Sequence, residues 1–488
     1  MAKSCPRTSV IVIGSGIAGL SAARKLTQCL PNCKVTILEA LSRPGGRINS
    51  VEINENEFME EGATWVHGIE DNPVHSLIKH NQVFNKYHYL IKYKFCKLNG
   101  DEVPTEHIKK YKRIYRKIKA DAENIYQDGS TLQNGEKSVG EFLQKEFQRK
   151  LKDLKLTREC ENTASSVFYS NSLIECCICG CNSLYDLVLN DFGEYEELGG
   201  GDLRVRGGYS QVIKELLKKL PENCVVYNST VTEVHWKNDH IPDESSKPVR
   251  IVCENGEQFF ADHVIATQSL GHLKEYGRAL FKPPLPQVKL DIIDRMGYNY
   301  ITKVHLRYQT PFWQDKFSRV IPLWDISPKD VVTKPSEFTK ETWFRHIYDF
   351  AVHPFLSNTL EVWLSGESAL HVERLENEII SDACTDLLRK FLKDPSVPKP
   401  DEILKTSWNT NPYFLGAYSY VAVGSSGEDC DGLAEPLCVE NSNSVDVPRV
   451  LFAGEATHRT FYSTTHGALL SGEREAGRLI SFYQCKFK

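Results

Sequence analysis

A glycine triplet near the start of the chain has the spacing of a dinucleotide-binding turn. Gly14, Gly16 and Gly19 follow a short apolar run and precede a predicted helix. Gly14 allows a tight turn, Gly16 lets the backbone approach a pyrophosphate, and Gly19 allows close packing of helix and strand. Glu39 ends a second apolar run, where a carboxylate binds both ribose hydroxyls of an adenosine and repels a 2′-phosphate. The sequence therefore predicts a diphosphate at the N-terminus of the helix.

A second glycine motif distinguishes FAD from NAD. The run Gly45-Gly46-Arg47 resembles the second glycine pair and arginine of the glutathione-reductase-like flavoproteins, and especially of the flavin-containing amine oxidase family. In these proteins the arginine reaches the diphosphate and holds the cofactor permanently, whereas an exchangeable NAD needs no such contact. The resemblance implies a tightly bound FAD.

His67 and Lys303 are the residues for which this resemblance implies a catalytic role. His67 belongs to the run Gly62-Ala63-Thr64-Trp65-Val66-His67-Gly68, which is similar to the G-A-x-W-x-H-G of polyamine oxidases. An isolated histidine is more often a satisfied core residue, but the flanking motif favours an active-site position. Lys303 belongs to a predicted strand over residues 302–308, where an ordinary lysine points to water. At the matching position of the amine oxidases, one lysine holds a water at the flavin N5 edge.

The C-terminal segment resembles the animal polyamine oxidases almost residue for residue. The resemblance is carried by residues 407–420, 450–458 and 461–468, and it covers nearly the whole chain. It implies that Glu455 binds the ribityl or diphosphate side of FAD. It also implies that a helix starting near Thr464 directs its first N–H groups at flavin N1 and O2, which stabilises the anionic reduced flavin.

Departures from the family pattern restrict how the cofactor is attached and which amines are expected as substrates. Ala417 stands where monoamine oxidases carry the cysteine attached to the flavin, so the FAD should be noncovalent. Tyr418 matches one wall of an aromatic cage and Thr464 replaces the other, which should admit a long secondary amine. Acetyl-preferring relatives tend to place an asparagine where this chain has Ile301. The preference between acetylated and free polyamines therefore stays open.

An acidic stretch over residues 190–197 resembles the substrate channel of the polyamine oxidases, where F-G-E-[YW] recurs. Glu194 and Glu197 flank Tyr195, and carboxylates there would stabilise the ammonium groups of a polyamine. For either residue alone, a solvated acidic loop explains the sequence equally well. We select Glu194 and Glu197 as the pair that binds substrate.

The complete predicted site combines cofactor, substrate and catalytic residues. The cofactor contacts are Gly14, Gly16, Ala18, Gly19, Glu39, Arg47, Thr64, Trp65, Val231, Trp408, Tyr418, Gly454, Glu455, Thr464 and Thr465. The substrate contacts are His67, Glu194, Glu197, Ile301 and Tyr418, and the catalytic residues are Lys303 and His67.

These residues require an α/β fold in two parts. We predict an FAD-binding, Rossmann-like (glutathione-reductase-like) domain made of residues 1–80, 203–275 and 405–488. A discontinuous α+β substrate-binding domain takes residues 81–202 and 276–404. Apolar residues at helical spacing predict helices over residues 105–127 and 138–154, and further strands are predicted over 345–350 and 359–365.

The composition is that of an ordinary globular protein. The 488 residues include 41% hydrophobic and 25% charged residues with a net charge of −5, which argues against nucleic acid and fits a cationic substrate. No apolar run approaches a membrane span, and the first strand follows the N-terminus without room for a signal peptide. We expect a cytoplasmic protein without nucleic-acid or membrane partners. The alternative is the peroxisome, although residues 485–488 do not match its usual signal.

The cysteines favour a reducing compartment and no metal. Fifteen scattered thiols suit the reduced state. Cys176, Cys177, Cys179 and Cys181 lie close together but lack the two spaced C-x-x-C pairs of a zinc site, so packing thiols are favoured.

The resemblance as a whole implies an FAD-dependent polyamine oxidase. Its substrates would be spermine or N1-acetylated spermine and spermidine, with molecular oxygen as the acceptor, and its products a shorter polyamine, an aminoaldehyde and hydrogen peroxide. The alternatives are a monoamine or amino-acid oxidase, or a flavoprotein that binds amines without catalysis. The amino-acid oxidase would need an arginine for the substrate carboxylate. The oligomeric state is not predicted.

Overall fold

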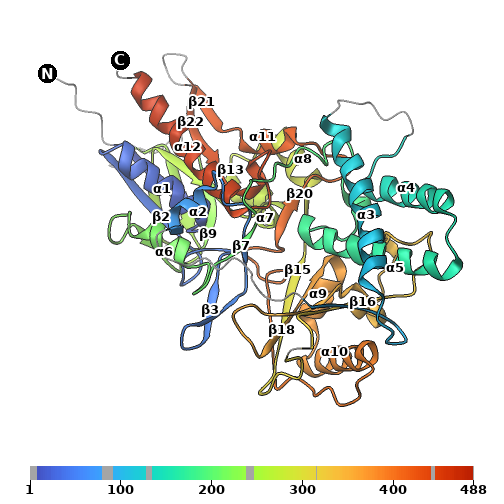
Figure 1. Cartoon of the computed structure of the whole chain (residues 1–488). Coiled ribbons are helices and arrows are strands. Elements are labelled where there is room, and N and C mark those ends of the chain that lie inside the picture. The colour runs from blue at the N-terminus through green and yellow to red at the C-terminus, as the bar shows by residue number, and fades with distance from the viewer. Residues whose placement is uncertain are drawn as a thin grey trace.

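Two β-sheets, each covered by helices, divide the chain into two lobes (Figure 1). The structure is a computed structural model, and it describes residues 8–79, 92–127, 135–237, 247–314, 316–440 and 446–486. Segments from the beginning, the middle and the end of the chain build the first lobe, so blue, green and red ribbons lie together in Figure 1. This lobe is therefore discontinuous in sequence.

The first lobe is built on a parallel sheet with the strand order β21-β22-β12-β1-β2-β8. The two strands at its centre are buried from both sides, which explains their almost continuous apolar sequences. The strands are β1 (Thr8–Ile13), β2 (Cys33–Leu38), β8 (Val225–Val226), β12 (His263–Ala266), β22 (Asp446–Phe452) and β21 (Leu437–Glu440), which runs antiparallel to β22.

Two long helices pack together on one face of this sheet. These are α1 (Ile17–Cys29) and α12 (Thr465–Lys486), and Ser21 Oγ of α1 donates to the carbonyl of Leu469 in α12 at 2.8 Å. A Cβ at Gly472 would overlap the carbonyl oxygen of Ala18, so glycine permits the close helix approach. The N-terminal helix is thereby fixed by the C-terminal one.

The other face of the parallel sheet carries a four-stranded sheet and two helices. The strand order is β11-β10-β9-β13. Its members are β9 (Val231–His235), β10 (Val249–Cys253), β11 (Gln258–Ala261) and β13 (Phe281–Lys282), with α7 (Leu270–Leu280) and α8 (Gln287–Arg295) beside them. Smaller elements of this lobe are β3 (Ser50–Asn54), β4 (Glu57–Glu60), β5 (Trp65–Val66), α2 (Pro73–Ile78), β7 (Leu203–Arg204), α6 (Gln211–Leu217), β14 (Gly297–Asn299), β20 (Tyr418–Tyr420) and α11 (Glu428–Ala434).

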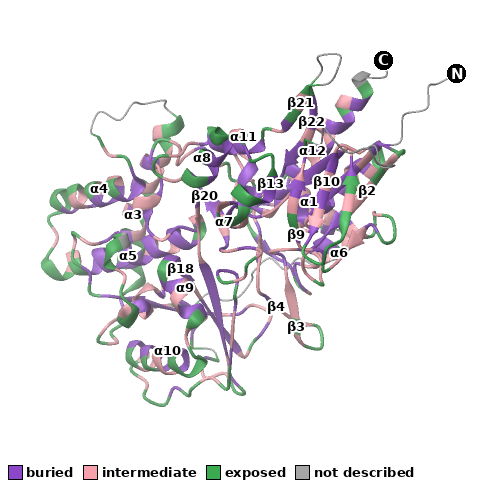
Figure 2. Ribbon diagram, turned by 180° about the vertical axis from the view of Figure 1, so that it is seen from behind, coloured by how far each residue is buried: buried purple, intermediate pink, exposed green. Residues whose placement is uncertain are grey.

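The second lobe is built on a mixed sheet with the order β19-β15-β18-β17-β16-β6. Its strands are β6 (Tyr93–Lys97), β15 (Ile301–Arg307), β16 (Arg319–Leu323), β17 (Phe350–Val352), β18 (Thr359–Ser365) and β19 (Glu402–Lys405). One hydrophobic core joins this sheet to α3 (Thr105–Gln127), α4 (Val139–Leu154), α5 (Arg158–Cys179), α9 (Gly366–Arg374) and α10 (Asn377–Leu392). Figure 2 shows the strands around β18 as buried, whereas α4 and α10 have exposed outer faces.

Most local predictions are confirmed, and one is wrong. The helices predicted over residues 105–127 and 138–154 are α3 and α4, and the strand predicted over 359–365 is β18. The strand predicted over 345–350 is instead the end of a 3₁₀ helix, Lys340–His346, followed by β17. The amide of Ile347 donates to the carbonyl of Phe344 at 3.2 Å, so the backbone closes a helical turn here before β17 begins.

The predicted domain division remains a proposal, with one boundary moved. Residues 276–296 were assigned to the substrate domain. The structure packs Leu280, Phe281, Leu290 and Met296 into the core of the first lobe, because β13 pairs with β9. We therefore propose that the FAD-binding part continues to about residue 296.

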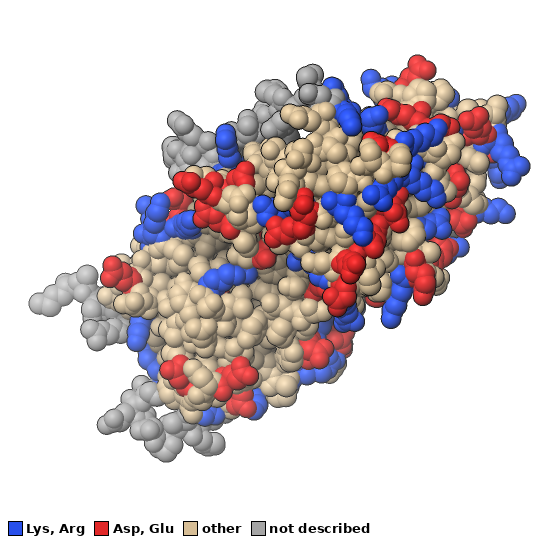
Figure 3. Space-filling view, turned by 90° about the horizontal axis from the view of Figure 1, so that it is seen from below, with Lys and Arg blue, Asp and Glu red and all other residues tan. Residues whose placement is uncertain are grey.

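The surface shows no strong separation of charge on the face seen in Figure 3, where basic and acidic side chains are interspersed. Among the described residues, no helix combines the length and the apolar character needed to cross a bilayer.

Candidate active site

A cavity of about 1190 Å³ extends between the two lobes and contains nearly all the predicted site residues. The predicted residues that line it are Gly14, Gly16, Ala18, Glu39, Arg47, Thr64, Trp65, His67, Glu197, Val231, Ile301, Lys303, Trp408, Tyr418, Gly454, Glu455, Thr464 and Thr465. Gly19 and Glu194 do not line it. Residues from the whole length of the chain therefore converge on one site.

The dinucleotide end of the cavity is shaped for a diphosphate and a ribose. Gly14 has φ +100°, and a Cβ at Gly16 would meet no protein atom within 4 Å, so the cavity reaches the backbone at the start of α1. The Glu39 carboxylate accepts from the Ser15 amide and hydroxyl at 2.7 and 2.6 Å, which fixes its orientation at the cavity wall. These residues fit the adenosine diphosphate part of FAD.

Gly19 has a packing role and is not a cofactor contact. A Cβ at this position would overlap the carbonyl oxygen of Gly14 and touch Val12. The prediction that it contacts the cofactor is therefore corrected, while its predicted role in packing α1 on β1 stands.

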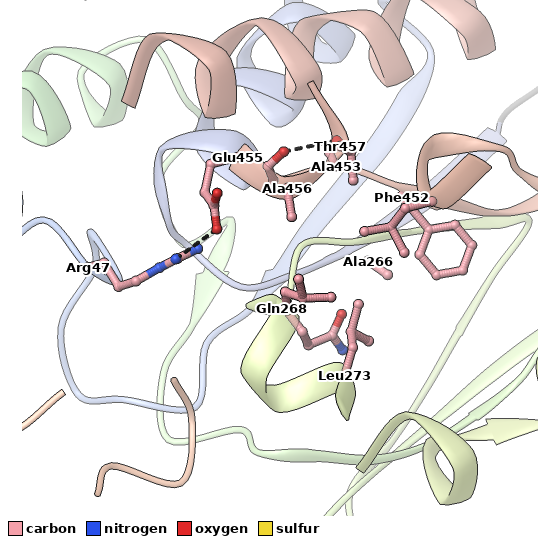
Figure 4. A pocket seen from close by; sticks show the side chains of 12 residues that line it. Arg47, Ala266, Gln268, Leu273, Phe452, Ala453, Glu455, Ala456 and Thr457 are labelled. Atoms are coloured by element: carbon pink, nitrogen blue, oxygen red, sulfur yellow. Dashed lines mark hydrogen bonds and ion pairs between the residues drawn. The ribbon is translucent and has the colours of Figure 1, made fainter. Parts of the chain in front are cut away.

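Arg47 and Glu455 form an ion pair at the centre of the first lobe. Arg47 Nη1 lies 3.0 Å from Glu455 Oε1 and donates to the carbonyl of Ala417 at 2.6 Å. Figure 4 shows this pair beside a small internal cavity of about 10 Å³. The other carboxylate oxygen of Glu455 accepts from the Ser419 hydroxyl and the Ser463 amide. The pair thus connects the second glycine motif with β20 and the start of α12.

The N-terminus of α12 opens into the cavity. Thr464 caps the helix, because its hydroxyl accepts from the Gly467 amide at 2.9 Å. Thr465 follows, and its hydroxyl lies 2.6 Å from that of Tyr209. The partial positive charge of the first-turn N–H groups makes this end of the helix suitable for the electron-rich edge of a flavin.

Lys303 is a buried ammonium group in the cavity wall. Its Nζ lies 3.0 Å from the Glu60 carbonyl and also donates to the Gly62 carbonyl and the Thr64 hydroxyl. The same nitrogen lies 4.5 Å from the centre of the Trp363 ring. Burial lowers the pKa of Lys303 from 10.5 to about 8. Three acceptors around one nitrogen match the three protons of the charged form.

His67 is held by a carboxylate that was not predicted. Its Nδ1 lies 3.2 Å from Asp202 Oδ2, and the other oxygen of Asp202 accepts from the Gly68 amide at 3.0 Å. Both side chains line the cavity. Asp202 therefore fixes the orientation of the ring.

The end of the cavity at α3 and α5 carries a cluster of acidic side chains. Glu123 of α3 and Glu175 of α5 line it together with Lys119 of α3. Lys119 Nζ lies 2.6 Å from Glu123 and 3.4 Å from Glu175, both measured to Oε1. Burial raises the pKa of Glu175. Two carboxylates beside one ammonium group make this end suited to a cationic ligand.

Glu194 is a structural residue, contrary to our prediction. The residue is 4% exposed, and its side chain forms an ion pair with Arg459 and accepts from the Tyr126 hydroxyl at 2.8 Å. A turn from Asp191 to Glu194 directs it into the protein, whereas Glu197 remains exposed at the cavity. Its carboxylate is occupied by Arg459 and is not presented to a ligand.

Comparison with known proteins decides the family. A family model of flavin containing amine oxidoreductases matches residues 17–480. The chain belongs to this family. Proteins named peroxisomal N(1)-acetyl-spermine/spermidine oxidase from Bos taurus and Homo sapiens are each 34% identical over 97% of this chain and 95% of the relative. Probable polyamine oxidase 5 from Arabidopsis thaliana is 32% identical over 99% of both chains.

A solved structure confirms the fold class of this amine oxidoreductase. A triple mutant of putrescine oxidase superposes with a TM-score of 0.66 at 19% identity, covering 97% of this chain and 99% of that one. The predicted Rossmann-like flavoprotein fold with an attached substrate-binding part is therefore confirmed, and FAD is the cofactor.

Several residues of this amine oxidoreductase site were missed from the sequence. They are Glu123, Glu175, Asp202, Arg204, Glu361 and Trp363, all of which line the cavity. Glu361 and Trp363 lie on β18, directly opposite His305 and Lys303 on β15. The strand predicted over residues 359–365 contains both Glu361 and Trp363, but only the pairing of the two strands places them beside Lys303.

We expect the FAD of this oxidoreductase to be noncovalent, because the side chain at position 417 is a methyl group without a nucleophile. Acid precipitation should leave the yellow colour in the supernatant. Flavin that stays with the pellet would contradict this expectation and point to one of the cavity thiols, Cys177 or Cys179.

Proposed function

We propose that this chain is an FAD-dependent polyamine oxidase that oxidises the carbon next to a secondary amine of spermine or of N1-acetylated spermine or spermidine. The relatives described above support this proposal through the substrates in their names. FAD supplies the hydride acceptor, and molecular oxygen then yields hydrogen peroxide. The products are a shorter polyamine and an aminoaldehyde.

The observation that carries the proposal is the distribution of charge along one cavity. Lys303 and His67 line the cavity together with the flavin-binding residues, Glu123 and Glu175 line it from α3 and α5, and Glu197 is an exposed residue of its wall. A monoamine has no second ammonium group to place there, whereas a polyamine has at least one. The chain therefore offers the second binding point that a long cationic amine requires.

The residues at the flavin end have separate tasks in this proposal. The ammonium group of Lys303 would hold a water and donate to it, once one of its present acceptors is released. His67, oriented by Asp202, would accept a proton from the substrate amine, which must be neutral when the hydride leaves. Trp65, Trp363 and Tyr418 exclude water from the same space.

An amino-acid oxidase is disfavoured by the arginines of the cavity. Arg204 and Arg319 both line it, but Arg204 is paired with Glu361 and Arg319 lies 3.0 Å from Asp349. Each guanidinium thus already has a buried carboxylate. A substrate carboxylate would have to displace one of these acids.

Peroxide release from the purified yellow protein tests the proposed function. Spermine, spermidine and their N1-acetyl forms should yield peroxide, and small primary monoamines and amino acids should not. Activity restricted to a monoamine or an amino acid would replace the proposal with that oxidase. Absence of peroxide with every amine would favour a flavoprotein that binds amines without oxidising them.

We propose the cytoplasm as the compartment.

Glu197→Gln should raise the KM for spermine more than it lowers kcat, because contact with a distal ammonium is the same in the ground and transition states. The effect should weaken with salt, since Glu197 is exposed. Glu196→Gln is the matched control, an exposed neighbour that does not line the cavity. Glu194→Gln should lower thermal stability and leave KM unchanged, because it weakens the ion pair with Arg459. Equal KM values for Glu197→Gln and the unmodified enzyme would remove Glu197 from the substrate site.

A further inference from the structure

A cluster of buried charges lies on the strands that carry Lys303. Glu361 of β18 is 2% exposed and forms an ion pair with Arg204 of β7, which is 5% exposed. Both residues line the cavity. His305 Nε2 lies 3.4 Å from the second oxygen of Glu361. An ion pair this deeply buried is costly to desolvate, so its presence calls for an explanation.

Strand register places Glu361 on the same face of the sheet as Lys303. Lys303 and His305 are two residues apart on β15, so their side chains share a face. They pair with Trp363 and Glu361 of β18. Glu361 is therefore the diagonal neighbour of Lys303, and side chains as long as these interact across a diagonal.

A metal ion does not account for this cluster. His305, His353 and Glu361 bring ligand atoms close together. However, Nδ1 of His353 accepts from the amides of Phe355 and Leu356 at 3.3 and 3.1 Å, so its proton resides on Nε2, which cannot then bind a metal. Arg204 occupies one oxygen of Glu361 and adds a positive charge beside the others.

Lys303 needs a negative neighbour to stay charged in this buried place. The charged and titratable groups near it are Glu361, Glu60, Glu61, Arg204, His305 and His353. Burial raises the pKa of Glu60 to about 7, so Glu60 is only partly ionised near neutral pH. Burial also disfavours the ionised form of Glu361, but Arg204 and His305 together hold its pKa well below the usual range. Glu361 is thus the buried carboxylate near Lys303 that stays negative.

We propose that Glu361 is a positioning residue that keeps Lys303 in its ammonium form, and that Arg204 keeps Glu361 ionised. Arg204 also stacks on Trp65, with the guanidinium carbon 4.6 Å from the ring centre. Arg204 therefore contacts both the Trp65 ring in the cavity wall and the carboxylate that acts on Lys303. The net effect of the pair on the charge of Lys303 is smaller than that of Glu361 alone, because the positive charge of Arg204 opposes part of the attraction that Glu361 supplies.

The charge of Lys303 can be measured directly in the FAD-loaded protein. Lysine labelled with ¹³C at Cε reports protonation by its chemical shift, and the Lys303 signal is the one missing from Lys303→Met. The midpoint of its titration should lie at about 8 in the unmodified protein. In Glu361→Gln it should fall by about one unit, because an attractive charge is lost while the repulsion of Arg204 remains.

A double variant separates this electrostatic role from a contribution to folding. Glu361→Gln alone leaves Arg204 buried without its carboxylate, which destabilises the protein. Arg204→Met combined with Glu361→Gln leaves neither charge, and its midpoint should lie between those of the unmodified protein and Glu361→Gln. Asp349→Asn is the matched control, since it removes another buried carboxylate from the same wall, and it should leave the midpoint unchanged.

An unchanged Lys303 midpoint in Glu361→Gln would overturn the proposal. If that variant does not fold, an unchanged midpoint in the double variant would do the same. One equivalent of bound zinc in the purified protein, lost on Glu361→Gln, would assign the cluster to a metal instead. The expected effect on rate rests on the proposed oxidase function. Turnover should be lost as the pH rises, and this loss should begin at a lower pH in Glu361→Gln than in the unmodified protein. The titration does not depend on turnover, so failure of the oxidase assay and failure of this inference remain distinguishable.

Discussion

Lys303→Met should slow flavin reduction or reoxidation by well over tenfold, at least about 1.4 kcal/mol of barrier, with FAD still bound. The substitution removes the buried ammonium group from the cavity wall, whereas Arg47 and Glu455 keep their contacts with the rest of the flavin site. Glu361 keeps Arg204 as its partner, so this carboxylate is not left isolated. Stopped-flow measurement of both half-reactions would show which step depends on the lysine.

Two variants control this result. Lys405→Met removes a lysine from the neighbouring strand β19, where it donates to the carbonyl of Leu375, and it should leave both half-reactions unchanged. Lys303→Arg keeps a positive charge but changes its shape, and it should retain part of the rate. Wild-type rates in Lys303→Met would show that the lysine only supports the structure.

Arg47→Met should abolish stable FAD binding and lower the stability of the protein by about 3 kcal/mol. Glu455 is 5% exposed, and loss of Arg47 leaves one of its carboxylate oxygens without its cation. The same loss frees the carbonyl of Ala417 and separates the second glycine motif from β20. The ratio of flavin to protein absorbance after gel filtration, together with the melting temperature, measures both effects.

A surface ion pair provides the comparison for this result. Arg24 lies 3.2 Å from Glu473 between α1 and α12, and Arg24→Met should cost at most about 1 kcal/mol without loss of flavin. Full flavin content in Arg47→Met would show that the arginine does not hold the cofactor. The contacts of Arg47 would then stabilise only the loop that carries the second glycine motif.

The local motifs of the flavin site could be predicted because their geometry is local. Gly14, Gly16 and Glu39 lie within one strand, helix and strand, and the spacing of these residues fixes where the turn and the carboxylate lie. The same holds for Thr464, which caps α12 through an amide three residues later. The helices α3 and α4 follow from their own apolar periodicity.

The roles of the acidic residues could not be predicted from local sequence in this way. Glu194 and Glu197 are three residues apart and equivalent in composition, yet Glu194 is buried against Arg459 and Glu197 lines the cavity. The partner of Glu194 lies 265 residues away in the chain. Glu175 belongs to a segment that was noticed for its cysteines, and only the packing of α5 against α3 brings it to Lys119.

By itself, the sequence determined the FAD-binding turn, the family and the identity of Lys303 and His67 as candidate residues, since these depend on short spacings and motifs. Tertiary structure decided what surrounds them. Lys303 donates to carbonyls some 240 residues earlier in the chain, and Glu361 reaches Arg204 across 157 residues. Strand register and domain packing set these contacts, and they decide the burial and therefore the charge of each group. The chemistry of the site is thus encoded locally, while its protonation state is a property of the fold.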